Sequence, residues 1–187
     1  MTTNNMNGPF RVESSNTVYS NPWIRVREDK VTRPDGKSGV FGIVEMKAGS
    51  TVLALDEQMN AYVIREYKYG IERETIELMS GGIDGNETAL DAAKRELAEE
   101  LRLKASEWID LGVVDPFTTV VRSQNFMFLA MRLEPTTGMA DEGEVLSFSK
   151  IPLEHAVEMV MRSEITHGAS CVCILKAHRY LIAGRHS

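Results

Sequence analysis

The chain has 187 residues, of which 43% are hydrophobic and 26% charged, an ordinary composition for a globular protein. Its length favours one domain of about 150 residues with an extension. A formal net charge of −6 argues against binding to a nucleic-acid backbone. It does not argue against a small phosphorylated substrate, because a bound metal ion reverses the local sign. The chain shows no charged-then-apolar leader and no long apolar run, so we expect a cytoplasmic protein that does not enter a membrane.

The first part of the chain is expected to form a flexible terminus and then a small antiparallel sheet. Residues 1–17 are rich in Asn, Ser and Thr, which predicts a mobile segment. Residues 23–31 alternate apolar and polar side chains, as a half-buried strand does, and residues 40–46 predict a second strand. The turn sequence PDGKSG joins the two strands into a hairpin. We therefore assign residues 18–48 to a β extension and residues 49–187 to the main domain.

Short strands interleave with a few helices in the main domain. Further strands are predicted at residues 50–55, 61–67, 74–78, 112–114, 124–133 and 145–149. Helices are predicted at residues 89–101, 152–162 and 169–183, the first with Thr88 as its N-cap and Asp91 completing a capping box. This mixture indicates an α/β/α sandwich or an α+β domain.

The segment GGIDGNETALDAAKRELAEELRL, residues 81–103, places a cluster of acids on one predicted helix. At 100° per residue, Glu96, Glu99 and Glu100 lie at about 0°, −60° and +40°, so all three share a face. Like charges at this spacing repel unless cations neutralise them. Mg²⁺ binds carboxylate oxygens and substrate phosphates, so the segment is a candidate catalytic helix. The alternative is a solvated acidic face, which the tight clustering beside Arg95 and the glycine-rich turn both disfavour.

The spacing of this segment resembles the Nudix box, the signature of hydrolases that cut nucleoside diphosphates linked to another group. Gly81 is followed by five residues, then Glu87, then seven residues, then the run RELAEE that begins at Arg95. The resemblance implies a mixed sheet between helices and dependence on Mg²⁺, with Mn²⁺ as a possible substitute. It also implies Glu96 and Glu100 as the principal metal ligands.

Four further residues of the box region have expected roles. Glu99 is the expected third ligand, and the resemblance adds the main-chain carbonyl of Ser80. We interpret Arg95 as a catalytic-site residue that orients a neighbouring carboxylate such as Glu87, rather than as a phosphate clamp. The family usually has glycine where this chain has Arg102, which predicts either strain at Arg102 or a helix that runs on to about Lys104. We favour the longer helix.

Outside the box, the chain is most similar to ADP-ribose pyrophosphatases and related nucleotide-sugar hydrolases. The segments IREYKYG at residues 64–70, ELMSGGID at residues 77–84 and ADEGEV at residues 140–145 carry this likeness. Relatives commonly have arginine where Lys68 stands, and a lysine contacts phosphate as a point charge and not as a bidentate fork. The substrate-binding residues that follow from the likeness are Lys68, Arg65 and Glu77.

Two loops and one strand supply the remaining candidates. In that branch a loop glutamate approaches the metals and acts as base, which here is Glu142, slightly favoured, or Glu144. Arg122 is a candidate contact for the sugar or a distal phosphate, with plain loop as the alternative. The N-terminal sheet of such relatives pairs with a second subunit and stacks an aromatic on the base. Phe41 best matches that aromatic, Trp23 is the weaker candidate, and a homodimer is expected.

The leading hypothesis is Mg²⁺-dependent hydrolysis of ADP-ribose or a nucleoside diphosphate sugar to a nucleoside monophosphate and a sugar phosphate. One alternative is a hydrolase of another diphosphate, such as a nucleoside triphosphate or a dinucleotide. Another is a non-catalytic nucleotide-binding module, which the intact acids disfavour. The two cysteines and four histidines form no zinc spacing, so we expect buried thiols and surface or satisfied histidines.

Overall fold

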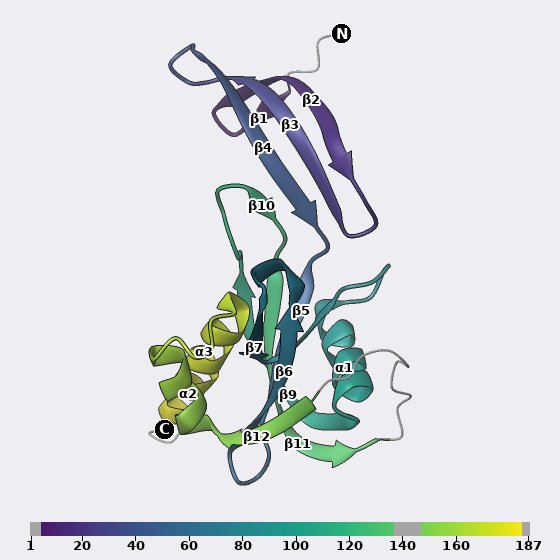
Figure 1. The fold of residues 1–187 in the computed structure, drawn as a ribbon, viewed down its shortest axis with the longest axis vertical. Helices are drawn as coiled ribbons and strands as arrows, with labels where there is room; N and C mark the ends of the chain where they lie inside the picture. The colour runs from purple at the N-terminus through teal and green to yellow at the C-terminus, as the bar shows by residue number, and fades with distance from the viewer. Residues whose placement is uncertain (1–4, 137–146, 185–187) are drawn as a thin grey trace. The chain divides into compact units, whose positions relative to one another are not determined.

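The computed structural model describes residues 5–136 and 147–184, and the chain divides into two compact units (Figure 1). Unit 1 comprises residues 1–47 and 115–124, and unit 2 comprises residues 48–114 and 125–187. Within the described residues, no helix is both long and apolar enough to cross a membrane.

Unit 1 is built on one sheet with the strand order β1-β2-β3-β4-β10. Its strands are β1 Met6–Asn7, β2 Phe10–Ser20, β3 Ile24–Thr32, β4 Ser38–Met46 and β10 Val121–Arg122. The predicted hairpin is confirmed, since β3 and β4 pair antiparallel from Ile24 with Met46 to Thr32 with Ser38. The short strand β10 pairs parallel with β4.

The expectation of a mobile terminus is wrong for residues 10–17, because β2 pairs antiparallel with β3 over this stretch. The cross-strand backbone bonds hold a polar sequence that buries little surface, and most side chains of β2 are exposed. Only Phe10, Val12 and Ser14 are partly buried, and so short an alternation does not identify a strand of 11 residues.

Unit 2 is a sandwich in which strands lie between helix α1 on one side and helices α2 and α3 on the other (Figure 1). Its sheets have the orders β8-β5-β11-β9 and β12-β6-β7. The strands are β5 Gly49–Ala54, β6 Asn60–Lys68, β7 Arg73–Glu77, β8 Met79–Gly82, β9 Leu103–Val114, β11 Asn125–Pro135 and β12 Ser147–Pro152. The helices are α1 Ala89–Glu100, α2 Leu153–Met161 and α3 Gly168–Gly184, and a 3₁₀ turn, η1, spans Tyr69–Ile71.

Alternation along β5 explains why the strands are apolar on both faces. Leu53 belongs to the core against α2 and α3, whereas Val52 and Ala54 belong to the core against α1. On α1, Ala93 and Leu97 are fully buried against that second core. The α/β/α sandwich with mixed sheets is thereby confirmed.

Helix α1 begins as expected but ends earlier. The Thr88 hydroxyl accepts the N–H of Asp91 at 3.1 Å and donates to its carboxylate at 2.7 Å, as in a capping box. The prediction that the helix runs on to about Lys104 is wrong. Leu101 is the C-cap, and Arg102 takes a left-handed conformation with φ of 53°. The reason is that β9 starts at once, at Leu103, and pairs with β11 along its length.

Candidate functional site

The acid-bearing face of α1 lies directly against strand β8. A Cβ atom on Gly81 would lie 2.0 Å from Cδ and Oε1 of Glu96, so any side chain there would force the Glu96 carboxylate to move. Gly81 pairs with Ser50 of β5, so the sheet fixes its position. The absence of a side chain at Gly81 therefore lets the Glu96 carboxylate approach the backbone of β8.

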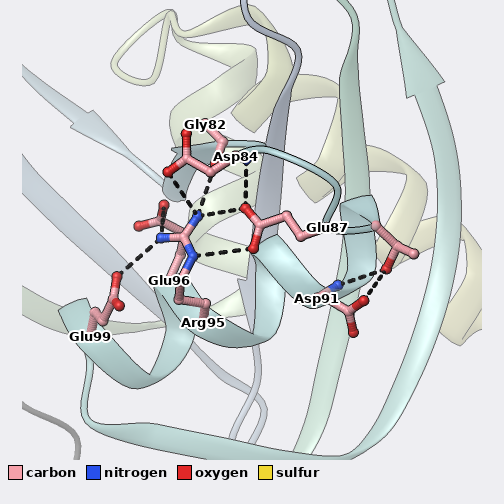
Figure 2. A network of polar contacts seen from close by, with 8 residues as sticks. Gly82, Asp84, Glu87, Asp91, Arg95, Glu96 and Glu99 are labelled. Atoms are coloured by element: carbon pink, nitrogen blue, oxygen red, sulfur yellow. Dashed lines mark hydrogen bonds and ion pairs between the residues drawn. The ribbon is translucent and has the colours of Figure 1, made fainter.

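Arg95 is the centre of the polar network on this face (Figure 2). Its Nη2 donates to Glu87 Oε1 at 2.9 Å and to the carbonyl of Gly82 at 3.0 Å. Its Nη1 donates to Glu96 Oε1 at 2.7 Å and to Glu99 Oε2 at 3.1 Å. The hydrogen bond with Glu87, followed by those with Glu96 and Glu99, raises the pKa of the guanidinium. The pairing of Arg95 with Glu87 that was expected from the spacing is present.

The glycine-rich turn is tied to α1 through Glu87. Glu87 Oε1 accepts the N–H of Asp84 at 2.7 Å as well as the Arg95 guanidinium. Because one carboxylate bonds both the turn and the helix, Arg95 and Glu87 together hold β8 and α1 in register.

Glu96 is an electrostatically costly residue at the centre of this arrangement. Its side chain is 14% exposed. Burial raises its pKa, the charges of Glu99 and Glu87 add to that effect, and the bonds from Arg95 oppose it. A partly buried acid among other acids favours a bound cation, since a cation would stabilise its ionised form.

The donors on this face fit Mg²⁺ by their chemistry, because they are carboxylate oxygens with a main-chain carbonyl close by. Arg95 Nη1 bridges the carboxylates of Glu96 and Glu99. Across residues 5–136 and 147–184, no three acidic, histidine or cysteine side chains converge on one point. Arg95 thus supplies part of the positive charge that a cation would otherwise bring.

The hydroxyl of Ser80 is held by two polar contacts. Its Oγ lies 2.8 Å from Oγ1 of Thr51 and donates to the carbonyl of Leu78 at 3.3 Å. Since the hydroxyl has these partners, the main-chain carbonyl is the oxygen of Ser80 that remains for the expected role.

Lys68 lies within electrostatic reach of the acid-bearing helix. Its Nζ is 2.6 Å from Glu66 Oε2 and 3.8 Å from Glu77 Oε2. Partial burial acts to lower its pKa, but the bond to Glu66 and the charges of Glu77, Glu66 and Glu100 outweigh it and raise the pKa. The structure therefore brings Lys68 and Glu77 together and sets them near Glu100.

Arg65 is not brought to the same face as Lys68. The two residues are three apart on β6, so their side chains point to opposite faces. Arg65 is paired with Glu74 at 3.6 Å, and both side chains are more than half exposed.

Two of the candidates of unit 1, Phe41 and Arg122, line one cavity of about 450 Å³. Phe41 lines it and packs edge-on against Phe10 with ring centroids 5.3 Å apart. Arg122 lines it too, with Nη1 3.7 Å from Glu45 Oε1. Trp23 is 75% exposed and is not among its lining residues. Glu142 and Glu144 lie outside the described residues.

His167 is a satisfied histidine, as expected, but its position beside Glu77 and Lys68 was not predicted. His167 Nδ1 lies 2.8 Å from Ser170 Oγ and 3.4 Å from Glu77 Oε2. About ninety residues separate His167 from Glu77 in the chain, so no local motif signals the contact. Of the two thiols, Cys173 is buried as expected and burial raises its pKa to about 12, whereas Cys171 is only partly buried.

Comparison with known proteins gives two family matches. The NUDIX domain matches residues 46–168, and the nucleoside diphosphate sugar hydrolase N-terminal domain matches residues 10–44. A Mycobacterium tuberculosis protein named ADP-ribose pyrophosphatase is 27% identical over 179 residues, covering 90% of this chain and 83% of its own. An Escherichia coli protein named ADP compounds hydrolase NudE is 29% identical over 151 residues, covering 81% and 74%.

A solved structure gives a matching fold. The crystal structure of an ADP compounds hydrolase superposes with a TM-score of 0.84 at 21% identity, covering 95% of this chain and 96% of that one. The likeness therefore extends over both units of the chain and concerns the fold.

Proposed function

This chain belongs to the Nudix family, whose domain spans residues 46–168, and on that premise we propose that it hydrolyses ADP-ribose or a related nucleoside diphosphate sugar with Mg²⁺. The products are a nucleoside monophosphate and a sugar phosphate. The observation that carries the proposal is the close approach of the Glu96 carboxylate to Gly81, which brings an acid-rich helix face to the backbone of β8. The names of the relatives from Mycobacterium tuberculosis and Escherichia coli support the substrate class.

The residues that would hold Mg²⁺, or Mn²⁺ in its place, are those of the acid-bearing face. Glu96 and Glu100 are the principal ligands, with Glu99 as a third and the carbonyl of Ser80 as a fourth. When bound, the ion supplies charge neutralisation and an activated water for in-line attack on a phosphorus.

The chain's own side chains prepare the site. Arg95 keeps the glutamates from repelling one another and holds Glu87 against the turn that carries the site. Lys68 places a positive point charge for a phosphate oxygen, and Glu77 stands beside it. We assign the base to Glu142 or Glu144. Each of the two, replaced by glutamine in turn, is the comparison that decides between them.

We assign the nucleotide end of the substrate to residues of unit 1. Phe41 offers an aromatic surface inside the cavity of that unit for stacking on a base. Arg122 lines the same cavity and offers a guanidinium for the sugar or a distal phosphate.

We also propose a homodimer formed through unit 1. Val31, at 4% exposure, is the one buried hydrophobic residue among the described residues of this unit, so its sheet has little core of its own. Apolar side chains share one face of that sheet, because Ile24 pairs with Met46 and Val26 with Val44. A second copy of the same face is the simplest cover for it.

A turnover screen with Mg²⁺ tests the proposed function. The panel is ADP-ribose, GDP-mannose, ADP-glucose, NADH and dGTP. We expect fastest turnover of ADP-ribose or a nucleotide sugar, with a nucleoside monophosphate among the products. Tight binding of one compound without turnover of any would replace the enzyme by a nucleotide-binding module. Preference for dGTP would move the chain to another substrate class.

A further inference from the structure

The residues at the start of helix α3 make polar contacts with β7 and with Leu78, which follows it. Thr166 Oγ1 accepts from Arg73 Nη2 at 2.8 Å. Ser170, which is fully buried, accepts the main-chain N–H of Leu78 at 2.9 Å. Between these contacts, His167 Nδ1 reaches both Ser170 Oγ at 2.8 Å and Glu77 Oε2 at 3.4 Å. Thr166 and His167, which directly precede α3, and Ser170 in its first turn thereby hold the junction between β7 and β8.

The direction of these hydrogen bonds follows from what each group is able to do. An ionised Glu77 carboxylate only accepts, and Ser170 Oγ has two lone pairs, one of them used by Leu78 N–H. The proton of the imidazole is therefore best placed on Nδ1, where it donates to Ser170 Oγ at 2.8 Å and faces the Glu77 carboxylate at 3.4 Å. Burial lowers the pKa of His167 against the opposite pull of Glu77, which leaves the ring neutral at neutral pH. His167 is thus a neutral donor that steadies a carboxylate.

Glu77 in turn is one of two carboxylates that compete for Lys68. Glu66 is 42% exposed and free to follow the lysine, with its Oε2 2.6 Å from Nζ. Glu77 is 13% exposed and fixed from behind by His167, with its Oε2 3.8 Å from Nζ. A lysine ammonium sits on a flexible side chain and lacks the planar geometry of a guanidinium. The Glu77 carboxylate therefore determines the position of the Lys68 ammonium. Loss of that anchor leaves Lys68 to swing out with Glu66.

We infer that His167 is a positioning residue, which through Glu77 holds the Lys68 ammonium where it meets a substrate phosphate. The inference rests on the proposed function in one respect, since it takes Lys68 as the phosphate contact. It assigns to α3, which bears none of the box acids, a part in binding the diphosphate. His167 acts through Glu77 and does not itself touch the substrate.

The test compares three substitutions in the full-length chain. His167→Leu removes the donor, and His167→Asn restores an N–H close to the position of Nδ1. His178→Leu is the matched control, because His178 lies on α3, which follows His167 directly, and also pairs with a glutamate, Glu154, at 3.1 Å. Steady-state rates with ADP-ribose and Mg²⁺ are measured for each, alone and in a Lys68→Met background.

A contact that acts equally on bound substrate and transition state changes KM and leaves kcat. We expect His167→Leu to raise KM about tenfold with kcat within about twofold. His167→Asn recovers most of the loss, and His178→Leu matches wild type. In the Lys68→Met background, His167→Leu has no further effect. An unchanged KM in His167→Leu, or the same rise in KM with and without Lys68, overturns the inference.

A binding measurement keeps this result separate from the fate of the proposed function. Calorimetric titration with imidodiphosphate and Mg²⁺ needs no turnover, since this compound carries the diphosphate group alone. We expect His167→Leu to bind it about tenfold more weakly than wild type. Absence of ADP-ribose turnover with that difference intact refutes the substrate and keeps the inference. Equal affinity of the two proteins, or no binding by either, overturns the inference.

Discussion

At the scale of single residues, the acids of α1 lie close together and share the positive charge of Arg95. Arg95 donates to Glu87, Glu96 and Glu99, which would otherwise repel one another. A divalent cation on the same face supplies charge of the same sign. The arginine and a bound cation would therefore neutralise the same carboxylates, and each would partly compensate for the absence of the other.

Arg95→Met is expected to lower the free energy of unfolding by about 2 kcal/mol without divalent ions, because several charge-assisted hydrogen bonds to partly buried acids are lost. With Mg²⁺ in excess the loss is expected to shrink, since the ion neutralises the same carboxylates. Urea unfolding with EDTA and with Mg²⁺ measures both values. Arg162→Met, which removes an exposed ion pair with Glu158 on α2, serves as the control and should show no Mg²⁺ dependence. A loss that is equal with and without Mg²⁺ would separate Arg95 from the metal site.

At the scale of elements, the end of α1 explains how the acids keep their geometry without the usual glycine. Leu101 caps the helix, and Arg102 turns the chain with φ of 53° so that β9 begins at Leu103. The Arg102 carbonyl also accepts the N–H of Thr136 at 2.9 Å, which fixes the turn from the neighbouring strand. The fold thus accepts the strain at Arg102 and leaves Glu96, Glu99 and Glu100 within the regular helix.

Arg102→Gly is expected to stabilise the protein by about 1 kcal/mol, because glycine adopts the left-handed region without the Cβ penalty. That change corresponds to about 2–4 °C in Tm for a chain of this size. Lys94→Gly, at an exposed position inside α1, is the matched control and should cost about 1 kcal/mol. Equal destabilisation by both glycines in thermal unfolding would show that Arg102 carries no strain.

The turn between β5 and β6 gives a pH-dependent prediction. Asp56 Oδ1 accepts the N–H of Asn60 at 2.8 Å, and its Oδ2 accepts from Lys150 at 3.2 Å. Burial acts to raise the pKa of Asp56, but the bonds from Asn60 and Lys150 outweigh it and hold the pKa below its usual 3.8. The ionised form is therefore favoured in the folded state. Its stabilising contribution is present above pH 3.8 and is lost as the pH falls through the lowered value.

Asp56→Asn should accordingly lower the free energy of unfolding by about 1 kcal/mol near pH 7. This loss should become smaller as the pH falls below the pKa of a free aspartate carboxyl. Asp35→Asn in the β3–β4 turn is the control, since Asp35 is mostly exposed and is 3.5 Å from Lys37. Denaturation at a series of pH values measures the difference. A cost for Asp56→Asn that stays constant with pH would contradict the assigned role of its charge.

At the scale of the whole molecule, the two units differ in how they are stabilised. Both hydrophobic cores consist of residues of unit 2. Unit 1 exposes apolar side chains on its sheet, with Tyr19 at 53%, Val40 at 59% and Met46 at 47% exposure. Association through unit 1 would bury this surface and stabilise a sheet that has little core.

Val26→Arg places a charge on the apolar face of unit 1, opposite Val44. We expect the wild type to elute with the mass of a dimer and Val26→Arg to elute as a monomer. Light scattering coupled to size-exclusion chromatography measures both masses. Val113→Arg, at an exposed valine of unit 2, is the control and should leave the mass unchanged. A monomeric wild type would remove the dimer.

The extent to which sequence alone predicted this molecule follows from how local each signal is. The start of α1 was predictable because Thr88 and Asp91 are three residues apart and bond to each other. Strands with a buried face were recognised by alternation, whereas β2 is mostly exposed and was missed. Alternation also indicates that the side chains of Arg65 and Lys68 lie on opposite faces of the strand, although the family likeness led us to assign both to substrate binding. The contact of His167 with Glu77 depends on how α3 packs, which no short pattern records.

The measurement that tests the central claim most directly is hydrolysis of ADP-ribose by wild type and Glu100→Gln with Mg²⁺, with the products separated by chromatography. We predict AMP and ribose 5-phosphate from the wild type. We predict a turnover lower by about two orders of magnitude or more in Glu100→Gln, with unchanged folding, because we propose Glu100 as a principal ligand of the cation. Glu158→Gln on α2 should match wild type. Near-full activity of Glu100→Gln would contradict the account, because it would remove Glu100 from the metal site.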